Sequence, residues 1–149
     1  MKWIMVANSN DCRIYEYDHD VKDLTLVDEI NHPENRLREH NLRPDRPGQY
    51  KSREANRGSY APEIGALDIA IDDFAREMAE RLDTGRNQHA YDDLTLLMPA
   101  AMEGLLLKHL NKNVAGSVHH IIQKNLMHLS EHELKKYLCK ALKHGKSIH

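Results

Sequence analysis

The residues with the clearest chemical potential lie between His32 and Glu63, mostly within RPDRPGQYKSREANRGSYAPE at positions 43–63. Arginine is the main cation there, and its planar guanidinium fork suits phosphate oxygens better than lysine does. Tyrosine rings between the arginines can stack on unpaired bases. The pattern therefore predicts an RNA contact made by Arg36, Arg38, Arg43, Arg46, Gly48, Gln49, Tyr50, Arg53, Arg57 and Tyr60. A solvated loop, or an arm packed on a second subunit, accounts for these residues equally well.

Carboxylates are absent from the places where a two-metal nuclease would need them. The apolar stretch from Trp3 to Asn8 contains no acid, and the stretch from Leu94 to Met98 is followed by Pro99. Asp92 and Asp93 stand at the beginning of the second stretch, which is the wrong end for a site at the carboxyl edge of a sheet. We therefore expect no metal-dependent nuclease.

The histidines and cysteines also lack the spacing of a metal site or a nucleophile. His119 and His120 are adjacent on a predicted strand and point to opposite faces, so they cannot chelate one ion together. Cys12 and Cys139 have no catalytic motif around them, and we expect two reduced thiols used for packing. The sequence therefore predicts neither a metal nor a cofactor.

The elements that must position these residues form a single α/β domain over residues 1–149. Alternating and apolar segments predict five strands, at 3–8, 12–17, 24–30, 94–98 and 118–122. Helices are predicted at 64–82, 100–110 and 131–142. This order, with three strands before the first helix, is that of a ribonuclease-H-like mixed sheet. The long basic loop at 32–63 falls between the third strand and the first helix.

Local signals set the expected ends of these helices. The first helix carries an apolar stripe at Leu67, Ile71, Phe74, Met78 and Leu82, and Thr84-Gly85 is expected to stop it. Residues 111–116 are expected to form a link between the second helix and the last strand. Ser130 and Glu133 have the spacing of a capping box, which predicts that the last helix begins directly after Ser130.

Charge is unevenly distributed along the chain. The net charge is −2 at pH 7, yet eight lysines and only two glutamates follow residue 107. This basic end favours an anionic partner, although attraction between the two parts within the fold explains the asymmetry more simply. The apolar N-terminal stretch is too short for a signal-peptide core or a membrane span. We therefore expect a soluble cytoplasmic protein.

Several blocks of this sequence resemble the bacterial host attachment protein family. They are His32-Pro33-Glu34, Arg36-Leu37, Leu42, Asp45-Arg46-Pro47-Gly48, the segment 74–82, Gly104-Leu105-Leu106 and Leu129-Ser130 with Glu133-Leu134. The resemblance covers nearly the whole chain. It implies a protein required for attachment to host cells, with no established catalytic activity.

That family in turn is similar to the middle domain of archaeal and eukaryotic peptide-chain release factors. In that domain a Gly-Gly-Gln loop positions water for peptidyl-tRNA hydrolysis, and Pro47-Gly48-Gln49 occupies the comparable place here. Pro47 departs from the motif, because proline fixes φ and removes an N–H where glycine gives freedom. The resemblance therefore implies binding to RNA or the ribosome without catalysis. A hydrolase that uses Gln49 and a dimerising, protein-binding regulator are the two alternatives.

Overall fold

The computed structural model describes residues 1–32 and 57–143, with side chains described from residue 68 to residue 141 in the second range. Five strands form one mixed sheet in the order β3-β2-β1-β4-β5. Their bounds are Lys2–Ala7 for β1, Asp11–Asp18 for β2, Asp23–Asn31 for β3, Asp93–Leu97 for β4 and Val118–Ile122 for β5. Each predicted strand is therefore present, with its ends shifted by no more than one residue.

The sheet has an antiparallel half and a parallel half. β1, β2 and β3 follow one another as an antiparallel meander, and β1 also pairs in parallel with β4, which pairs in parallel with β5. Ile4 lies opposite Tyr15 on one side and Thr95 on the other. β1 is thus central and covered on both faces, which is why its sequence is apolar without alternation.

Four helices accompany the sheet in the described residues. They are α3 (Arg57–Asn87), α4 (Ala100–His109), α5 (Lys112–Ser117) and α6 (Glu131–Lys143). The prediction for α3 was wrong at both ends, because the helix begins seven residues before Ile64 and continues past Leu82. Residues 112–117 are helical rather than a link, and the Asn111 side chain caps this turn by accepting a hydrogen bond from the Val114 N–H at 2.9 Å.

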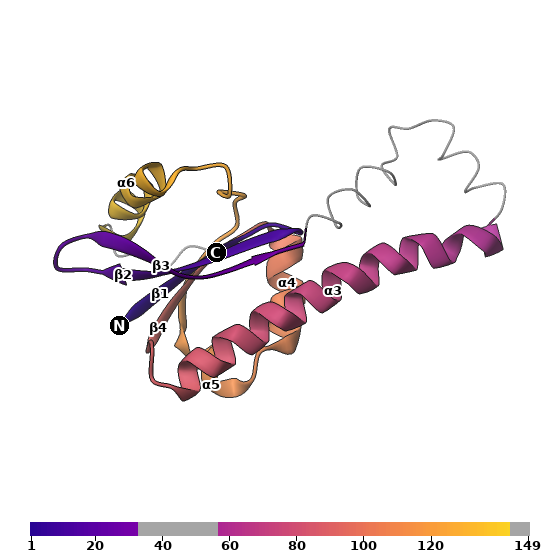
Figure 1. The fold of residues 1–149 in the computed structure, drawn as a ribbon, viewed down its shortest axis with the longest axis horizontal. Helices are drawn as coiled ribbons and strands as arrows, with labels where there is room; N and C mark the ends of the chain where they lie inside the picture. Colours follow the sequence, from indigo (N-terminus) through magenta and orange to yellow (C-terminus); the bar gives the residue numbers. More distant parts are fainter. Residues whose placement is uncertain (33–56, 144–149) are drawn as a thin grey trace.

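The helices divide between the two faces of the sheet. Figure 1 shows α3, α4 and α5 on one side of the sheet and α6 on the other. The first face forms the larger core, where Met5, Ile14 and Leu96 of the sheet pack with Phe74 and Met78 of α3. This packing explains the apolar stripe of α3, since every residue of the stripe from Phe74 to Leu82 is fully buried.

Gly85 has a packing role instead of the predicted role of helix stop. A Cβ atom at this position would lie 2.5 Å from the Trp3 ring and 3.2 Å from Tyr91. Those two rings stack with their centroids 4.7 Å apart, and Tyr91 Oη donates to the Leu82 carbonyl at 2.7 Å. The missing side chain therefore lets the aromatic pair close directly onto the helix.

The second face is covered by α6. Leu134 and Leu138 of this helix pack with Ile4, Tyr17 and other apolar residues of the sheet. The predicted capping box is confirmed: Ser130 Oγ accepts from the Glu133 N–H at 3.1 Å, and Glu133 Oε1 accepts from the Ser130 N–H at 2.9 Å. Within the described ranges, no helix is both long enough and apolar enough to cross a membrane.

Candidate functional site

The arginine-rich stretch lies largely outside the described residues. Arg36, Arg38, Arg43, Arg46, Gly48, Gln49, Tyr50 and Arg53 all belong to residues 33–56, and their roles stay predictions. Arg57 and Tyr60 lie in the first turns of α3, so the prediction that placed them in a loop was wrong for their backbone. The loop predicted at 32–63 is thus shortened at its C-terminal end.

The chain is held firmly at the point where the arginine-rich stretch begins. The His32 N–H donates to the Asn10 carbonyl at 2.7 Å, and His32 Nε2 lies 2.9 Å from Glu77 Oε1 on α3. The His32 ring also packs against Phe74, with their ring centroids 5.0 Å apart. The first residue of the His-Pro-Glu block therefore fixes the end of β3 to both the sheet and α3.

An ion-pair network continues from this anchor along α3. Arg81 Nη1 donates to both carboxylate oxygens of Asp28, at 2.7 and 2.6 Å, and Arg81 Nη2 lies 3.2 Å from Glu77. Hydrogen bonding to Asp28 raises the pKa of Arg81. Burial beneath this network, together with the nearby charge of Asp28, raises the pKa of the Cys12 thiol well above its usual range. Cys12 is therefore a neutral packing residue, as the sequence predicted.

Acidic residues do gather at the edge that the sequence predicted, away from the carboxyl ends of the parallel strands. Asp93 begins β4, where its carboxylate lies 3.5 Å from Lys2 Nζ and 3.0 Å from His119 Nδ1. Across the described ranges, no three His, Cys, Asp or Glu side chains come together in a way that could hold a metal ion. The described residues thus offer no two-metal centre.

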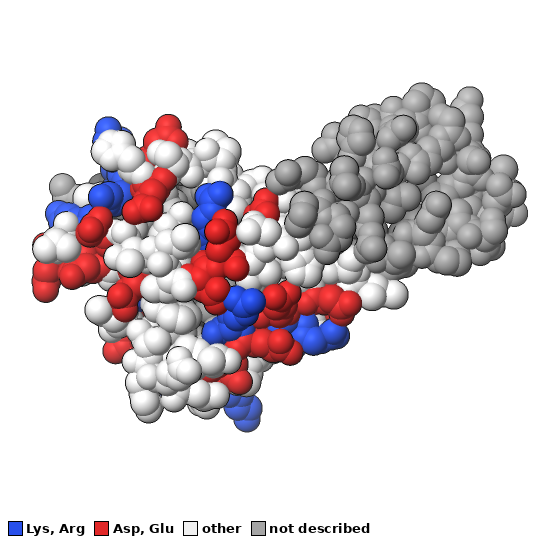
Figure 2. Space-filling view, in the orientation of Figure 1, with Lys and Arg blue, Asp and Glu red and all other residues white. Residues whose placement is uncertain are grey.

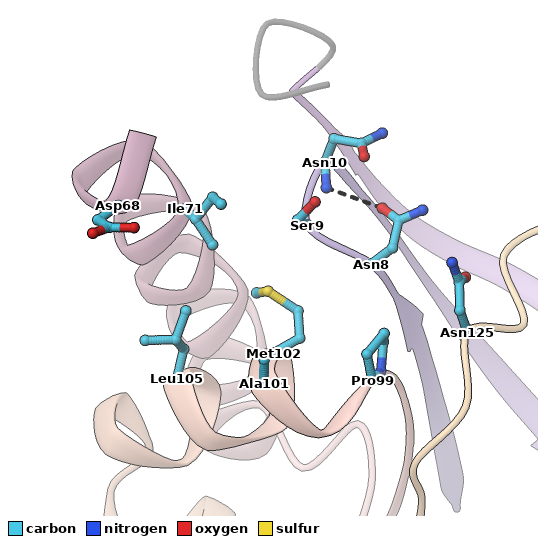
Figure 3. A pocket seen from close by; sticks show the side chains of 10 residues that line it. All are labelled: Asn8, Ser9, Asn10, Asp68, Ile71, Pro99, Ala101, Met102, Leu105 and Asn125. Carbon is cyan, nitrogen blue, oxygen red and sulfur yellow. Dashed lines mark hydrogen bonds between the residues drawn. The ribbon is translucent and has the colours of Figure 1, made fainter. Parts of the chain in front are cut away.

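A cavity of about 590 Å³ lies at the opposite, carboxyl edge of the parallel strands (Figure 3). It is lined by the turn after β1, the residues after β4 and β5, and the facing sides of α3 and α4. Its described lining consists of Asn8, Ser9, Asn10, Asp68, Ile71, Pro99, Ala101, Met102, Leu105 and Asn125. In open α/β sheets, ligands typically bind outside the carboxyl ends of the strands, which makes this cavity the candidate site.

The polar wall of the cavity is built from amide side chains with defined orientations. Asn8 Oδ1 accepts from the backbone N–H groups of Asn10 at 3.0 Å and Asp11 at 2.8 Å. Because both partners are N–H donors, the oxygen must face them and the Nδ2 donor must point away. Asn10 is 5% exposed, and its Nδ2 donates to Asp11 Oδ2 at 2.6 Å. The turn therefore holds both amides in fixed positions.

The other wall is apolar, and its charge is limited to one group. Ile71 of α3 and Leu105 of α4 lie across the cavity from Asn8 and Asn125 (Figure 3). Asp68 is the one titratable side chain in the described lining, which contains no Lys, Arg, His or Cys. The described walls provide hydrogen bonds and apolar contact, and they contain no His, Lys or Cys that could act as a base beside the Ser9 hydroxyl.

Sequence reasoning missed this cavity. Asn8 was predicted to end the first strand, Ser9 and Asn10 fell between the first two predicted strands, and the carboxyl edge of the sheet was considered as a site for carboxylates alone. The available signal was the strand order itself, since the ends of β1, β4 and β5 must meet at one edge when those strands are parallel. Asn125 and the α4 residues come together with the turn only in the folded chain.

Outside the cavity, acidic side chains gather on α3 and lysines on α6 (Figure 2). Figure 2 shows acidic side chains gathered over α3, where Asp72, Asp73 and Glu77 lie near Arg76 and Arg81. On α6, Lys135 Nζ lies 2.9 Å from Asp23 Oδ1 of β3. This ion pair joins the basic C-terminal part of the chain to the acidic part before residue 108. Lys136 and Lys140 are exposed, and neither has an ion-pair partner among the described residues.

The fold and the cavity define an α/β domain with a five-stranded mixed sheet and a ligand-sized hollow at its carboxyl edge. The chain belongs to the family described as "Protein required for attachment to host cells", which matches residues 3–138. Membership associates the chain with attachment to host cells and confirms the resemblance drawn from the sequence blocks. No curated protein matches the chain.

One similar solved structure is described as "Archaeal protein". It superposes with a TM-score of 0.56 at 11% sequence identity, over 95% of this chain and 34% of its own length. At this identity the likeness concerns the fold alone. The present chain therefore corresponds to about a third of that larger protein.

Proposed function

We propose that this chain is a non-catalytic RNA-binding module of the host attachment family, with a ribonuclease-H-like fold related to the middle domain of peptide-chain release factors. The strand order β3-β2-β1-β4-β5 and the antiparallel-then-parallel pairing support the fold assignment. RNA, in ribosomes or elsewhere, is the partner whose phosphates suit the arginine-rich stretch. A cytoplasmic location follows from this partner, and the effect on attachment is then indirect.

The observation that carries the proposal is the basic face of α6, whose lysines at positions 136 and 140 have no acidic partner among the described residues. Lys136 and Lys140 are one helical turn apart and therefore lie on the same face. Both are exposed, whereas the neighbouring Lys135 is paired with Asp23. Two neighbouring cations that no described acid pairs with keep their charge available for phosphates, and each phosphate neutralised on a single strand contributes about 0.7 to the salt dependence of binding.

The test replaces these two charges and compares matched lysines elsewhere. Lys136→Gln with Lys140→Gln removes the pair, and Lys108→Gln with Lys112→Gln removes two exposed lysines from α4 and α5. Affinity for a labelled single-stranded oligoribonucleotide is measured between low and physiological salt. We expect the first pair to weaken binding several-fold and to reduce the salt slope by about 1.4, and the second to change neither. Equal effects of both pairs, or no binding at all, would reject the proposal.

The arginine-rich stretch is tested in the same assay. The variants replace arginine by glutamine at positions 36, 38, 43, 46 and 53. None of these positions lies in α3, because that helix begins at Arg57. The proposal expects a further loss of affinity and a smaller salt slope. If these variants bind like the native chain, the stretch does not contact RNA.

A dimerising regulator is the second candidate, and the edge strand β3 favours it. β3 pairs only with β2 in the described sheet, and Leu26 and Val27 on it are 45% and 42% exposed. Unpaired edges with apolar side chains tend to recruit another chain. Light scattering of the native chain and of Leu26→Lys over a range of concentrations tests this role. A native monomer at all concentrations rules out dimerisation.

The hydrolase alternative rests on Gln49 alone. Gln49 itself lies outside the described residues. Peptidyl-tRNA hydrolysis on ribosomes is compared for the native chain and Gln49→Ala. A native rate above background that falls with Gln49→Ala would establish the enzyme and displace the non-catalytic proposal.

A further inference from the structure

We propose that the cavity at the carboxyl edge of β1, β4 and β5 binds a single unpaired nucleobase. The base would be held along its edge by the asparagine wall and on its face by the apolar wall. This inference deepens the proposed RNA-binding function and rests on it for the source of the base.

The hydrogen-bonding groups of the polar wall form a mixed pattern. Asn8 Nδ2 is turned away from the two N–H groups that its oxygen accepts from. Asn125 Oδ1 accepts from the Met127 N–H at 3.2 Å, which turns its Nδ2 away in the same manner. Asn10 commits its Nδ2 to Asp11 and keeps its Oδ1 as an acceptor. The wall therefore offers two donors and one acceptor.

A nucleobase edge is complementary to such a wall. Each base presents ring nitrogens or carbonyl oxygens as acceptors beside exocyclic or ring N–H donors, and asparagine amides are suited to pair with such edges. Single-stranded RNA exposes these edges because its bases can be splayed out of the stack. A ligand with acceptors alone would offer Asn10 Oδ1 no donor in place of solvent, and an unmade hydrogen bond costs free energy.

The opposite wall suits the flat face of a base. Ile71, Met102 and Leu105 present aliphatic carbon and a thioether, and Met102 is only 4% exposed. Thioether sulfur makes favourable contacts with aromatic rings. The cavity volume of about 590 Å³ lies within the range of small-molecule sites and leaves room for the attached ribose.

Charge argues against a phosphate or another anion in the same place. The described lining contains no cationic side chain, and Asp68 adds a negative charge. Pro99 stands at the N-terminal end of α4, where helix N–H groups favour anions, but the Asp68 carboxylate and the Asn10 acceptor oppose one. A neutral base with its phosphate outside the cavity satisfies both observations.

The first test uses free adenosine and uridine, which carry no phosphate. Ala101→Trp fills the cavity from an exposed position on α4, and Ala100→Trp places the same ring on the neighbouring exposed position outside the lining. Asn125→Asp removes one donor at constant size, with Asn113→Asp as the matched change on α5. We expect at least one nucleoside to bind the native chain, with a tenfold or greater loss in Ala101→Trp and Asn125→Asp only.

Thermal unfolding of all four variants shows whether each is folded. If Ala101→Trp does not fold, Asn125→Asp and its control decide the question, because Asn125 is an exposed residue. Binding that is equally strong in Ala101→Trp and Ala100→Trp overturns the proposal. The proposal is also overturned if neither nucleoside binds and the chain binds a normal RNA strand and an abasic RNA strand equally well.

The second test distinguishes the source of the base. A single-stranded oligoribonucleotide is compared with an abasic strand of the same length and the same phosphates. A tenfold preference for bases that Ala101→Trp removes assigns the cavity to a base within RNA. Nucleoside binding without any strand binding keeps the cavity as a nucleoside site and rejects the RNA function. If both strands bind with equal, salt-dependent affinity, the RNA-binding function is supported and the nucleobase site is rejected.

Discussion

The two faces of the sheet are closed in different ways. The α3 face has three helices over it, and its core extends from Ile30 at one edge of the sheet to Val118 at the other. The α6 face is covered by one 13-residue helix, and its described core is smaller. Three buried polar atoms have no hydrogen-bond partner among the described residues: Thr95 Oγ1 and His120 Nδ1 on this second face, and Trp3 Nε1 on the first.

This difference indicates that the two faces serve different purposes. The α3 face combines a larger apolar core with ion pairs that join β3 to α3, so we expect it to contribute more to the folding free energy. Among the described residues, the basic helix α6 is attached to its face through apolar contacts and the ion pair of Lys135 with Asp23. We therefore expect substitutions on the α3 face to change global stability, and those on the α6 face to act more locally.

The largest expected effect is the loss of a buried ring on the α3 face. Phe74→Ala should lower the free energy of unfolding by about 3–5 kcal/mol, because Phe74 is fully buried and contacts the His32 ring. Leu138→Ala on α6 removes an equally buried side chain. It should cost about 2 kcal/mol, near the lower end for such changes, because a terminal helix can shift to close the space.

Urea unfolding followed by circular dichroism measures both variants. Leu107→Ala, at an exposed apolar position on α4, is the control and should change the free energy of unfolding by less than about 0.5 kcal/mol. If Leu138→Ala lowers the free energy of unfolding as much as Phe74→Ala does, the two faces contribute equally to stability.

The next effect concerns the close approach of α3 to the aromatic pair. Gly85→Ala introduces a Cβ that would lie 2.5 Å from the Trp3 ring, and such overpacking costs about 1–3 kcal/mol. Alanine favours the helix by about 1 kcal/mol, which offsets only part of this cost. We expect a net loss of up to about 2 kcal/mol, measured by thermal unfolding.

Gly104→Ala separates the two contributions. Gly104 lies in α4, and a Cβ there would meet no atom within 4 Å. This change should therefore stabilise the chain by up to about 1 kcal/mol through helix propensity alone. Stabilisation by both variants would mean that the Trp3 ring can move aside without cost.

The sequence predicted the sheet well because its signals are local. Apolar runs bounded by turn residues located the five strands, and the Ser130 capping box located the start of α6. The start of α3 was missed because Gly58 and Pro62 disfavour helix by their own propensities, so the pattern pointed to Ile64. Gly85 looked like a stop because its contact with Trp3 joins residues 82 positions apart.

The candidate site was less predictable than the fold. Its polar wall needs the turn after β1 beside Asn125, and its apolar wall needs α3 beside α4. Neither neighbourhood leaves a motif in the sequence, because amides and aliphatic side chains are also common in ordinary turns and cores. The arginine-rich stretch has the opposite character, since its composition is conspicuous in the sequence and it lies mostly outside the described residues.

A smaller effect is expected at the cap of α6. Ser130→Ala removes the hydroxyl that accepts from the Glu133 N–H, and loss of such a cap costs about 1 kcal/mol. On this face the loss should appear as faster amide hydrogen exchange in α6, with little change in α3. Ser130→Asp, which can cap in the same way, should restore protection. Equal acceleration of exchange in both helices would contradict the local character of the α6 face.

The smallest expected effect is the acid dependence of the ion pair that joins α6 to β3. The hydrogen bond from Lys135 lowers the pKa of Asp23 below its ordinary value. A carboxyl group with a lowered folded-state pKa adds stability above its unfolded pKa, about 3.9, and loses it as the pH falls through the folded value. Asp23→Asn should therefore be less stable than the native chain at pH 7 and match it near pH 2.

Thermal unfolding of the native chain and of Asp23→Asn between pH 7 and pH 2 measures this difference. Asp72→Asn is the matched change on the α3 face, where the hydrogen bond from His109 lowers the pKa of Asp72. Both variants should approach the native chain in acid. Only Asp23→Asn should also speed hydrogen exchange in α6 at pH 7, because only Asp23 contacts that helix. Faster exchange in α6 from both variants would mean that the two faces unfold together, whereas an effect confined to Asp23→Asn supports α6 as a separately released element.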